Sequence, residues 1–229
     1  MNNIKKEQLA VGKFSLLSAI FLVLAGISYV NVPYAQKLII FSKSYFESFN
    51  QNLVPYFGFW ISMFIQAMFM IGVLLFFKKI NPKLEESPVF TWISTLAIIG
   101  YMLMGLTYIS RLYYMPNVTN AYLNSSAGTQ ETIVALGTME FDKFIMSYGF
   151  SSLWFITLAI YSIRYKLFNK AITTLSVIIS LGYAVALLGY FIRTRILTTG
   201  SSCLVILFPI WAFLIYKHIN NETNYMKSI

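Results

Sequence analysis

The chain has 229 residues, of which 58% are hydrophobic and only 11% are charged. Soluble domains are about 45–50% apolar and about 25% charged, so this composition excludes a water-soluble enzyme and a disordered chain, and it predicts an integral membrane protein. A net charge of +9 would suggest nucleic-acid binding in a soluble protein. Here most lysines and arginines flank apolar segments, where they act as topology signals, so no nucleic-acid partner is expected.

Six uncharged apolar segments are long enough to cross a hydrocarbon core of about 30 Å. They cover residues 14–32, 54–77, 89–110, 144–163, 171–192 and 196–216. Continuous apolar runs favour helices, because apolar and polar residues alternate in the strands of a membrane barrel. We therefore predict an all-α polytopic membrane protein, a single domain over residues 1–229 with six transmembrane helices. The first segment resembles a signal peptide in outline, but no small-residue cleavage site follows it, and we interpret it as a retained span.

The distribution of basic residues predicts the orientation of these spans, because cytoplasmic loops carry an excess of lysine and arginine. With the N-terminus inside, eleven basic residues lie on short cytoplasmic segments and six lie on the opposite side. We predict a multi-pass protein of the bacterial cytoplasmic membrane with both termini inside. Membrane lipids are accordingly expected partners.

The outer connections, residues 33–53 and 111–143, are much longer than the inner ones, residues 78–88 and 164–170. The first long loop mixes apolar residues such as Phe46 with charged ones at a spacing compatible with an amphipathic helix. In the second, Ser126 or Thr129 is suited to cap a short helix before the fourth span. We expect short amphipathic helices in both loops, forming a cap over the outer ends of the bundle. The alternative is surface helices that float in the membrane interface.

Residues with catalytic potential are scarce. No span contains an ionisable residue of the kind that ion-coupled pumps need, which disfavours a proton or sodium pump. The single histidine, His218, follows Lys217 at the end of the last span, and the single cysteine, Cys203, lies in an apolar segment. No metal-ligand spacing or catalytic triad accompanies them, so we expect no cofactor and favour a non-enzymatic protein.

Charged residues do converge at the outer ends of the spans. This candidate ligand-binding cluster consists of Arg111, Tyr114, Glu140, Asp142, Arg193 and Arg195. In one interpretation an arginine pairs with Glu140 or Asp142 and pins the helix ends, while the other cations touch lipid headgroups. In the other, the cluster lines an outward-facing pocket for an anionic or amphipathic ligand, because arginine favours planar pairing with carboxylates and phosphates.

A few polar residues lie within the spans. They include Gln66, Tyr101, Trp154 and Tyr183, and serines at helical spacing at positions 147, 151, 176 and 180. Small and hydroxyl-bearing residues at this spacing allow close helix packing and interhelical hydrogen bonds. We interpret them as packing residues in preference to the lining of a ligand channel.

Several stretches resemble the six-span bacterial membrane proteins of the DUF4386 family. The opening GKFSLLSAIFLVLAGISYV is similar to the family's first span, AYLNSSAGTQETIVALG and FIMSYGFSSLWFITLAIYSIRYKLFNKAIT to its loop and fourth span, and FPIWAFLIYKHIN to its last helix. The turn LFNKAI departs from the Pro-Arg or similar pair that family members often carry there. The resemblance implies the same six-span fold and no particular activity.

Three functional hypotheses follow from these observations. The first is a protein that binds or senses a small amphipathic molecule or lipid at its outer face. The second is an interaction or immunity-type subunit of a larger membrane complex, with another membrane protein as its partner. The third is a lipid-modifying enzyme that uses Glu140 or Asp142 as an acid or base, for which spacing alone identifies no second catalytic residue.

Overall fold

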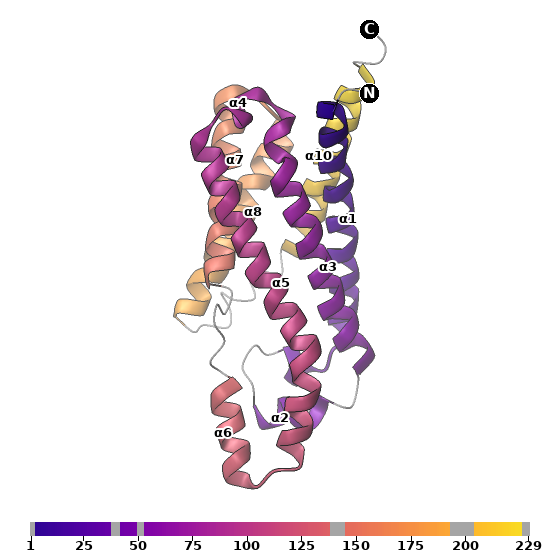
Figure 1. The fold of residues 1–229 in the computed structure, drawn as a ribbon, viewed down its shortest axis with the longest axis vertical. Coiled ribbons are helices and arrows are strands. Elements are labelled where there is room, and N and C mark those ends of the chain that lie inside the picture. The colour runs from indigo at the N-terminus through magenta and orange to yellow at the C-terminus, as the bar shows by residue number, and fades with distance from the viewer. Residues whose placement is uncertain (1–2, 38–41, 50–52, 138–144, 193–203, 226–229) are drawn as a thin grey trace.

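The computed structural model describes residues 3–37, 42–49, 53–137, 145–192 and 204–225, and every regular element in these ranges is helical (Figure 1). The elements are α1 (Asn3–Asn31), η1 (Tyr34–Lys37), α2 (Lys43–Ser48), α3 (Leu53–Phe77), η3 (Lys78–Ile80), α4 (Pro82–Glu85), α5 (Pro88–Leu123), α6 (Ala127–Gly137), α7 (Ile145–Tyr165), α8 (Lys170–Phe191) and α10 (Leu204–Tyr225). Six helices of the described chain are long and apolar enough to span a membrane. The chain is an all-α polytopic bundle, as its sequence predicts.

The six long helices form a closed ring. Each packs against the next along the chain, in the order α1, α3, α5, α7, α8 and α10, and α10 packs back against α1. The helices run up and down the bundle, so that α1 begins and α10 ends at the same end of the molecule (Figure 1). We call this the α4 end, because α4 lies there, and we call the opposite end, which carries α2 and α6, the capped end.

Aromatic side chains fill the centre of the ring toward the α4 end. Phe77 of α3 and Trp154 of α7 meet edge to face with ring centroids 5.0 Å apart, and Trp211 of α10 lies 6.1 Å from Trp154. The indole of Trp154 donates to Ser94 Oγ at 3.1 Å. These contacts join four of the six helices, and they give the buried indole N–H the partner that it needs in an apolar medium.

The third long helix, α5, differs from its predicted extent. It does not end near Ser110 but continues for 13 more residues to Leu123, through Pro116. Its 36 residues give a length of about 54 Å at 1.5 Å per residue, well beyond a hydrocarbon core of about 30 Å. The predicted span of residues 89–110 is therefore shorter than the helix that contains it, because hydropathy shows which residues suit lipid, and a helix continues into water where other elements pack on it.

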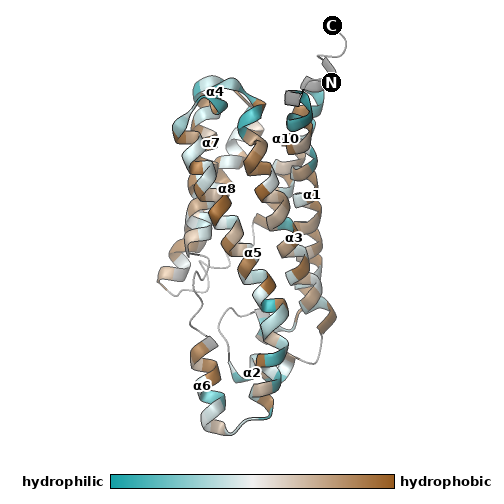
Figure 2. Ribbon diagram, in the orientation of Figure 1, coloured by the Kyte–Doolittle hydropathy of each residue, from teal (hydrophilic) through white to brown (hydrophobic). Residues whose placement is uncertain are grey.

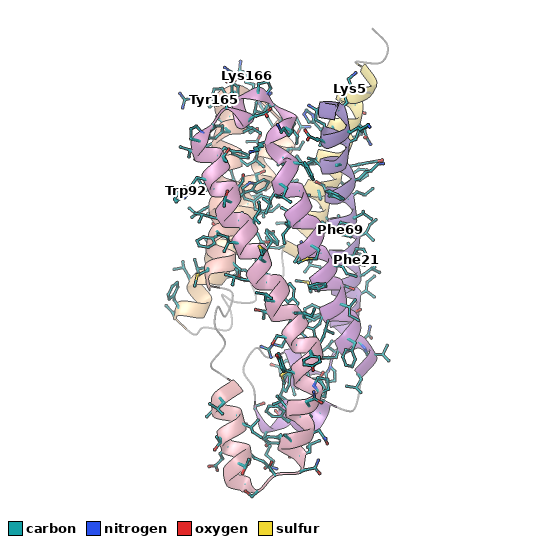
Figure 3. The ribbon with its side chains drawn as sticks, viewed as in Figure 1. Lys5, Phe21, Phe69, Trp92, Tyr165 and Lys166 are labelled. Carbon is teal, nitrogen blue, oxygen red and sulfur yellow. The ribbon has the colours of Figure 1, made fainter. Side chains whose placement is uncertain are left out.

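Two exposed aromatic residues of α5 are spaced as the two interfaces of a membrane would be. Trp92 is 62% exposed and Tyr113 is 68% exposed, and Figure 3 shows Trp92 on the outer flank of the bundle. Tryptophan and tyrosine favour the membrane interface. The 21 residues between these two positions span about 31 Å, which matches the hydrocarbon core. Residues after Tyr114 therefore form an extramembrane extension of α5.

Both expected loop helices are present, and they pack on this extension. Phe46 of α2 stacks on Tyr122 of α5 with ring centroids 4.4 Å apart. Ile133 and Val134 of α6 pack against the same buried cluster, and α6 begins directly after Ser126. The first loop helix is thus docked on the protein, not floating in the interface. Figure 2 shows more hydrophilic residues at both ends of the bundle than along its middle.

Candidate binding site at the capped end

Arg111 lies on the inner face of α5 at the level where that helix leaves the membrane. One stripe of α5 is buried as it enters the capped end, comprising Tyr108, Arg111, Met115, Thr119 and Tyr122. These residues follow one another at intervals of three or four, the spacing that places side chains on one face of a helix. The Arg111 side chain is only 6% exposed. A cation is therefore enclosed by protein two residues before the exposed Tyr113.

Aromatic rings surround the Arg111 guanidinium. Its carbon lies 5.7 Å from the centroid of the Trp60 ring on α3. The same indole lies 5.6 Å from the ring of Tyr108, one turn deeper on α5. A guanidinium over an indole face gains a cation–π attraction that reaches about 2 kcal/mol when both groups are desolvated. Trp60 thus provides an apolar wall that still favours a positive charge.

Two tyrosine hydroxyls connect α2 and α3 to this position. The Tyr45 hydroxyl of α2 donates to the Tyr56 hydroxyl at 3.4 Å, and Tyr56 donates to the Arg111 carbonyl at 3.2 Å. The Arg111 side chain also lies near the Tyr45 hydroxyl. Burial raises the pKa of the Tyr45 hydroxyl above its usual value, while the Arg111 charge and the bond to Tyr56 oppose that change. Tyr45 therefore stays a neutral phenol beside the arginine.

One hydroxyl on the same stripe of α5 has no partner among the described residues. Thr119 is buried, and its Oγ1 makes no hydrogen bond within the described part of the chain. Thr119 lies two turns beyond Arg111, on the side away from the membrane. A buried hydroxyl without a partner costs about 1–3 kcal/mol, so such atoms mark places where water or a ligand group fits.

The structure places only part of the predicted cluster. Tyr114 is 58% exposed and its ring contacts Tyr113, so it does not join the rings around Arg111. The other four predicted residues, Glu140, Asp142, Arg193 and Arg195, lie outside the described residues. Whether one of the two acidic residues pairs with Arg111 stays a prediction.

Other side chains replace Tyr114 around the guanidinium. Tyr45, Tyr56 and Trp60 lie around Arg111, and none of them belongs to the predicted cluster. The spacing of two of them could have been recognised in the sequence. Tyr56 and Trp60 are four residues apart, so they share a face of α3.

Side chains at the capped end can bind a charged group and form hydrogen bonds. Within the described ranges, no three histidine, cysteine, aspartate or glutamate side chains gather as metal ligands. His218 lies at the α4 end, on the last helix, with its ring 5.2 Å from that of Phe168. The arrangement around Arg111 is suited to hold an anion at the membrane boundary between aromatic walls.

Comparisons with protein-family models, with curated proteins and with solved structures found no match to this chain. The resemblance to the DUF4386 family therefore stays a prediction. Any function must be argued from the geometry of the chain itself.

Proposed function

We propose that this chain is a non-enzymatic, multi-pass membrane protein that binds a small amphipathic molecule or lipid at its capped end, with Arg111 recognising the anionic group. The observation that carries the proposal is the burial of Arg111 at the membrane boundary, beneath α2 and against Trp60. Arginine pairs with planar carboxylates and phosphates. An amphipathic molecule carries such an anion at the same depth, because its polar head lies at the interface and its chain lies in the hydrocarbon.

The surrounding side chains support an amphipathic ligand over a free inorganic anion. Trp60 and Tyr108 continue the aromatic wall from Arg111 into the membrane-spanning part of the bundle. Phe46, Tyr56 and Met115 enclose the position from the side of the cap. Apolar side chains dominate such binding sites, and a few placed polar groups orient the ligand.

We further propose that the capped end faces outward and that both termini are cytoplasmic. Basic residues lie on the elements that meet at the α4 end: Lys78 on η3, which contacts α4, Lys83 on α4, Arg164 in the last turn of α7 and Lys170 at the start of α8. Figure 3 shows Lys5 and Lys166 at this same end. An excess of lysine and arginine on one side is typical of the cytoplasmic side. The binding site then opens toward the extracytoplasmic surface.

The experiment compares oleate with oleyl alcohol as probes on the purified protein, measuring the melting temperature in mild detergent. The two probes share a chain and differ in the charge of the head. We expect oleate to raise the melting temperature of the wild type and oleyl alcohol to leave it unchanged, because only the carboxylate pairs with Arg111. The variant Arg111→Ala should lose the oleate response.

The matched control is Arg164→Ala. Arg164 also lies over an aromatic ring, that of Tyr165 at 5.4 Å, but it is exposed and belongs to the α4 end. This variant should keep the full oleate response. Equal responses of wild type and Arg111→Ala would contradict the proposal. The structural ion pair would be favoured instead by two results together. Glu140→Gln or Asp142→Asn would lose as much stability as Arg111→Ala, and no protein would respond to oleate.

A further inference from the structure

Three hydroxyl groups meet in the middle of the bundle. Tyr101 of α5 and Tyr183 of α8 bring their hydroxyl oxygens within 3.2 Å, and the Ser151 hydroxyl of α7 lies beside that of Tyr101. All three side chains are buried. Tyr101 follows the interfacial Trp92 by nine residues, which places it about 14 Å into a core about 31 Å thick. These groups therefore lie near the middle of the membrane.

The cluster holds more hydroxyl protons than its own hydrogen bonds can use. Each hydroxyl carries one proton to donate, so the three groups hold three protons. Contacts along the row from Ser151 through Tyr101 to Tyr183 use at most two of them. The Ser151 oxygen has no partner at normal hydrogen-bond distance among the described residues. At least one buried O–H therefore lacks an acceptor within the described part of the chain, and a buried donor without an acceptor is costly.

The surroundings of the cluster are aromatic. The Tyr148 ring meets that of Tyr183 edge to face at 5.3 Å, and the Phe155 ring stacks on Tyr183 at 6.0 Å. A neutral molecule with an apolar body is compatible with such walls. A charged group at this depth would need a counter-charge to offset its desolvation.

We propose that Tyr101, Tyr183 and Ser151 form a mid-membrane binding site for the carbonyl oxygen of a neutral, lipophilic molecule. The physical reason is that the ligand and the cluster each supply the hydrogen-bonding group that the other lacks. A carbonyl dissolved in the hydrocarbon core finds no hydrogen-bond donor there, and the cluster holds a donor without an acceptor. Joining them satisfies both groups, and the apolar body of the ligand loses nothing by leaving lipid. This site goes beyond the anion site at Arg111, from which it is separated by ten residues of α5, or about 15 Å.

The experiment uses 10-nonadecanone labelled with ¹³C at its carbonyl, a ketone whose polar group lies in the middle of its chain. The full-length protein is placed in phosphatidylcholine nanodiscs, and the infrared carbonyl band of the probe is compared with that in empty nanodiscs. The label separates this band from the lipid esters. We expect a second band at lower frequency in the wild type, since a hydrogen bond from a phenol weakens the C=O bond.

The variant Tyr101→Phe/Tyr183→Phe removes two of the three donors with almost no change in shape, and it should weaken the shifted band. The matched control Tyr113→Phe alters an exposed tyrosine of the same helix and should keep it. If the double variant fails to fold, as judged by its melting temperature, Ser151→Ala replaces it and should reduce the shifted band.

The proposal is overturned if the wild type shows no shifted band, or if the band is undiminished in a folded double variant. It is also overturned if the hydroxyls bind water alone, which would appear as an O–H band sensitive to H₂¹⁸O without any shifted carbonyl. No anionic probe enters this measurement. Its failure is therefore distinguishable from failure of the oleate response at Arg111.

Discussion

Two residues occupy environments that cost free energy, the buried Arg111 and the left-handed Lys166. Burying a cation costs several kcal/mol, which the Trp60 face and the Tyr45 hydroxyl partly offset at Arg111. Lys166 has a φ of 54°, a conformation that side chains with a Cβ adopt at a cost of about 1–2 kcal/mol. It directly follows α7, and the Leu167 N–H returns to the Ser162 carbonyl at 3.3 Å. In helix ends with this hydrogen bond, the residue with the positive φ is usually glycine.

Replacing Lys166 with glycine should therefore stabilise the protein by about 1 kcal/mol, because glycine adopts a positive φ without strain. The measurement is the free energy of unfolding in mixed micelles. Lys166→Ala is the control, since it removes the same charge but keeps the Cβ, and it should give no gain. Equal stabilisation by both variants would show that the charge, not the backbone conformation, carries the cost.

At the scale of the element, α5 carries residues of both proposed binding sites. It contacts α3 and α7 within the membrane and α2 and α6 beyond it. Close approach to α7 depends on Gly100, where an added Cβ would lie 3.2 Å from both the Cα and the carbonyl oxygen of Ser147. Backbone atoms of a packed helix do not move aside as a flexible side chain does. A small residue at this crossing lets α5 and α7 approach closely, as in other membrane helix pairs.

Gly100→Ala should destabilise the bundle by about 1–3 kcal/mol, because the new methyl group forces α5 and α7 apart. Gly149→Ala is the matched control in a neighbouring span, since its added Cβ would meet only a Leu187 side-chain carbon at 3.6 Å. That control should be neutral or slightly stabilising, because alanine favours helix over glycine. Comparison of melting temperatures in detergent checks both, and equal effects of the two substitutions would contradict the argument.

The whole molecule is asymmetric along the membrane normal. The α4 end has an aromatic core in the centre of its ring and basic residues at its surface, whereas the capped end has the α5 extension and the buried Arg111. This asymmetry supports a site that opens on one side only. It also makes the orientation testable, because the two ends would meet different compartments.

Reporter fusions should place residues after Lys83 and Lys166 in the cytoplasm, and positions near Ser44 and Ser125 outside. The reason is the excess of basic residues at the α4 end. Alkaline phosphatase, which is active only outside, and a fluorescent protein that folds in the cytoplasm give opposite readouts at each position. A reversed pattern would turn the binding site toward the cytoplasm and contradict the proposed outward orientation.

Much of the fold was predictable from sequence because lipid imposes a simple rule. A backbone in hydrocarbon must satisfy its own hydrogen bonds, so long apolar runs become helices. Some of the polar residues predicted to pack helices hydrogen-bond across helices in the described part of the chain. Gln66 donates to Ser18 at 3.2 Å, Trp211 donates to Ser176 at 2.9 Å, and the Ser180 and Ser152 hydroxyls lie 3.1 Å apart.

The candidate site was predictable only in part. Arg111 stood out because it is a charge at the end of an apolar run. Its neighbours on α2 and α3 are Tyr45, Tyr56 and Trp60, which lie 51 to 66 residues earlier in the chain. No local pattern shows which rings enclose a side chain across such a separation. Tyr114 was selected for its nearness in sequence, and helix geometry instead leaves it exposed.

The sequence by itself determined which segments lie in lipid and which lie in water. It shows six apolar helices, polar connections and an uneven distribution of basic charge. These properties depend on single residues and their transfer into lipid. Tertiary structure alone decided that α5 continues to Leu123 and that α2 docks on it. It also decided that Arg111 is enclosed and that Tyr101 meets Tyr183. The physical reason is that those features are contacts between distant segments, whose free energy exists only once the helices have assembled.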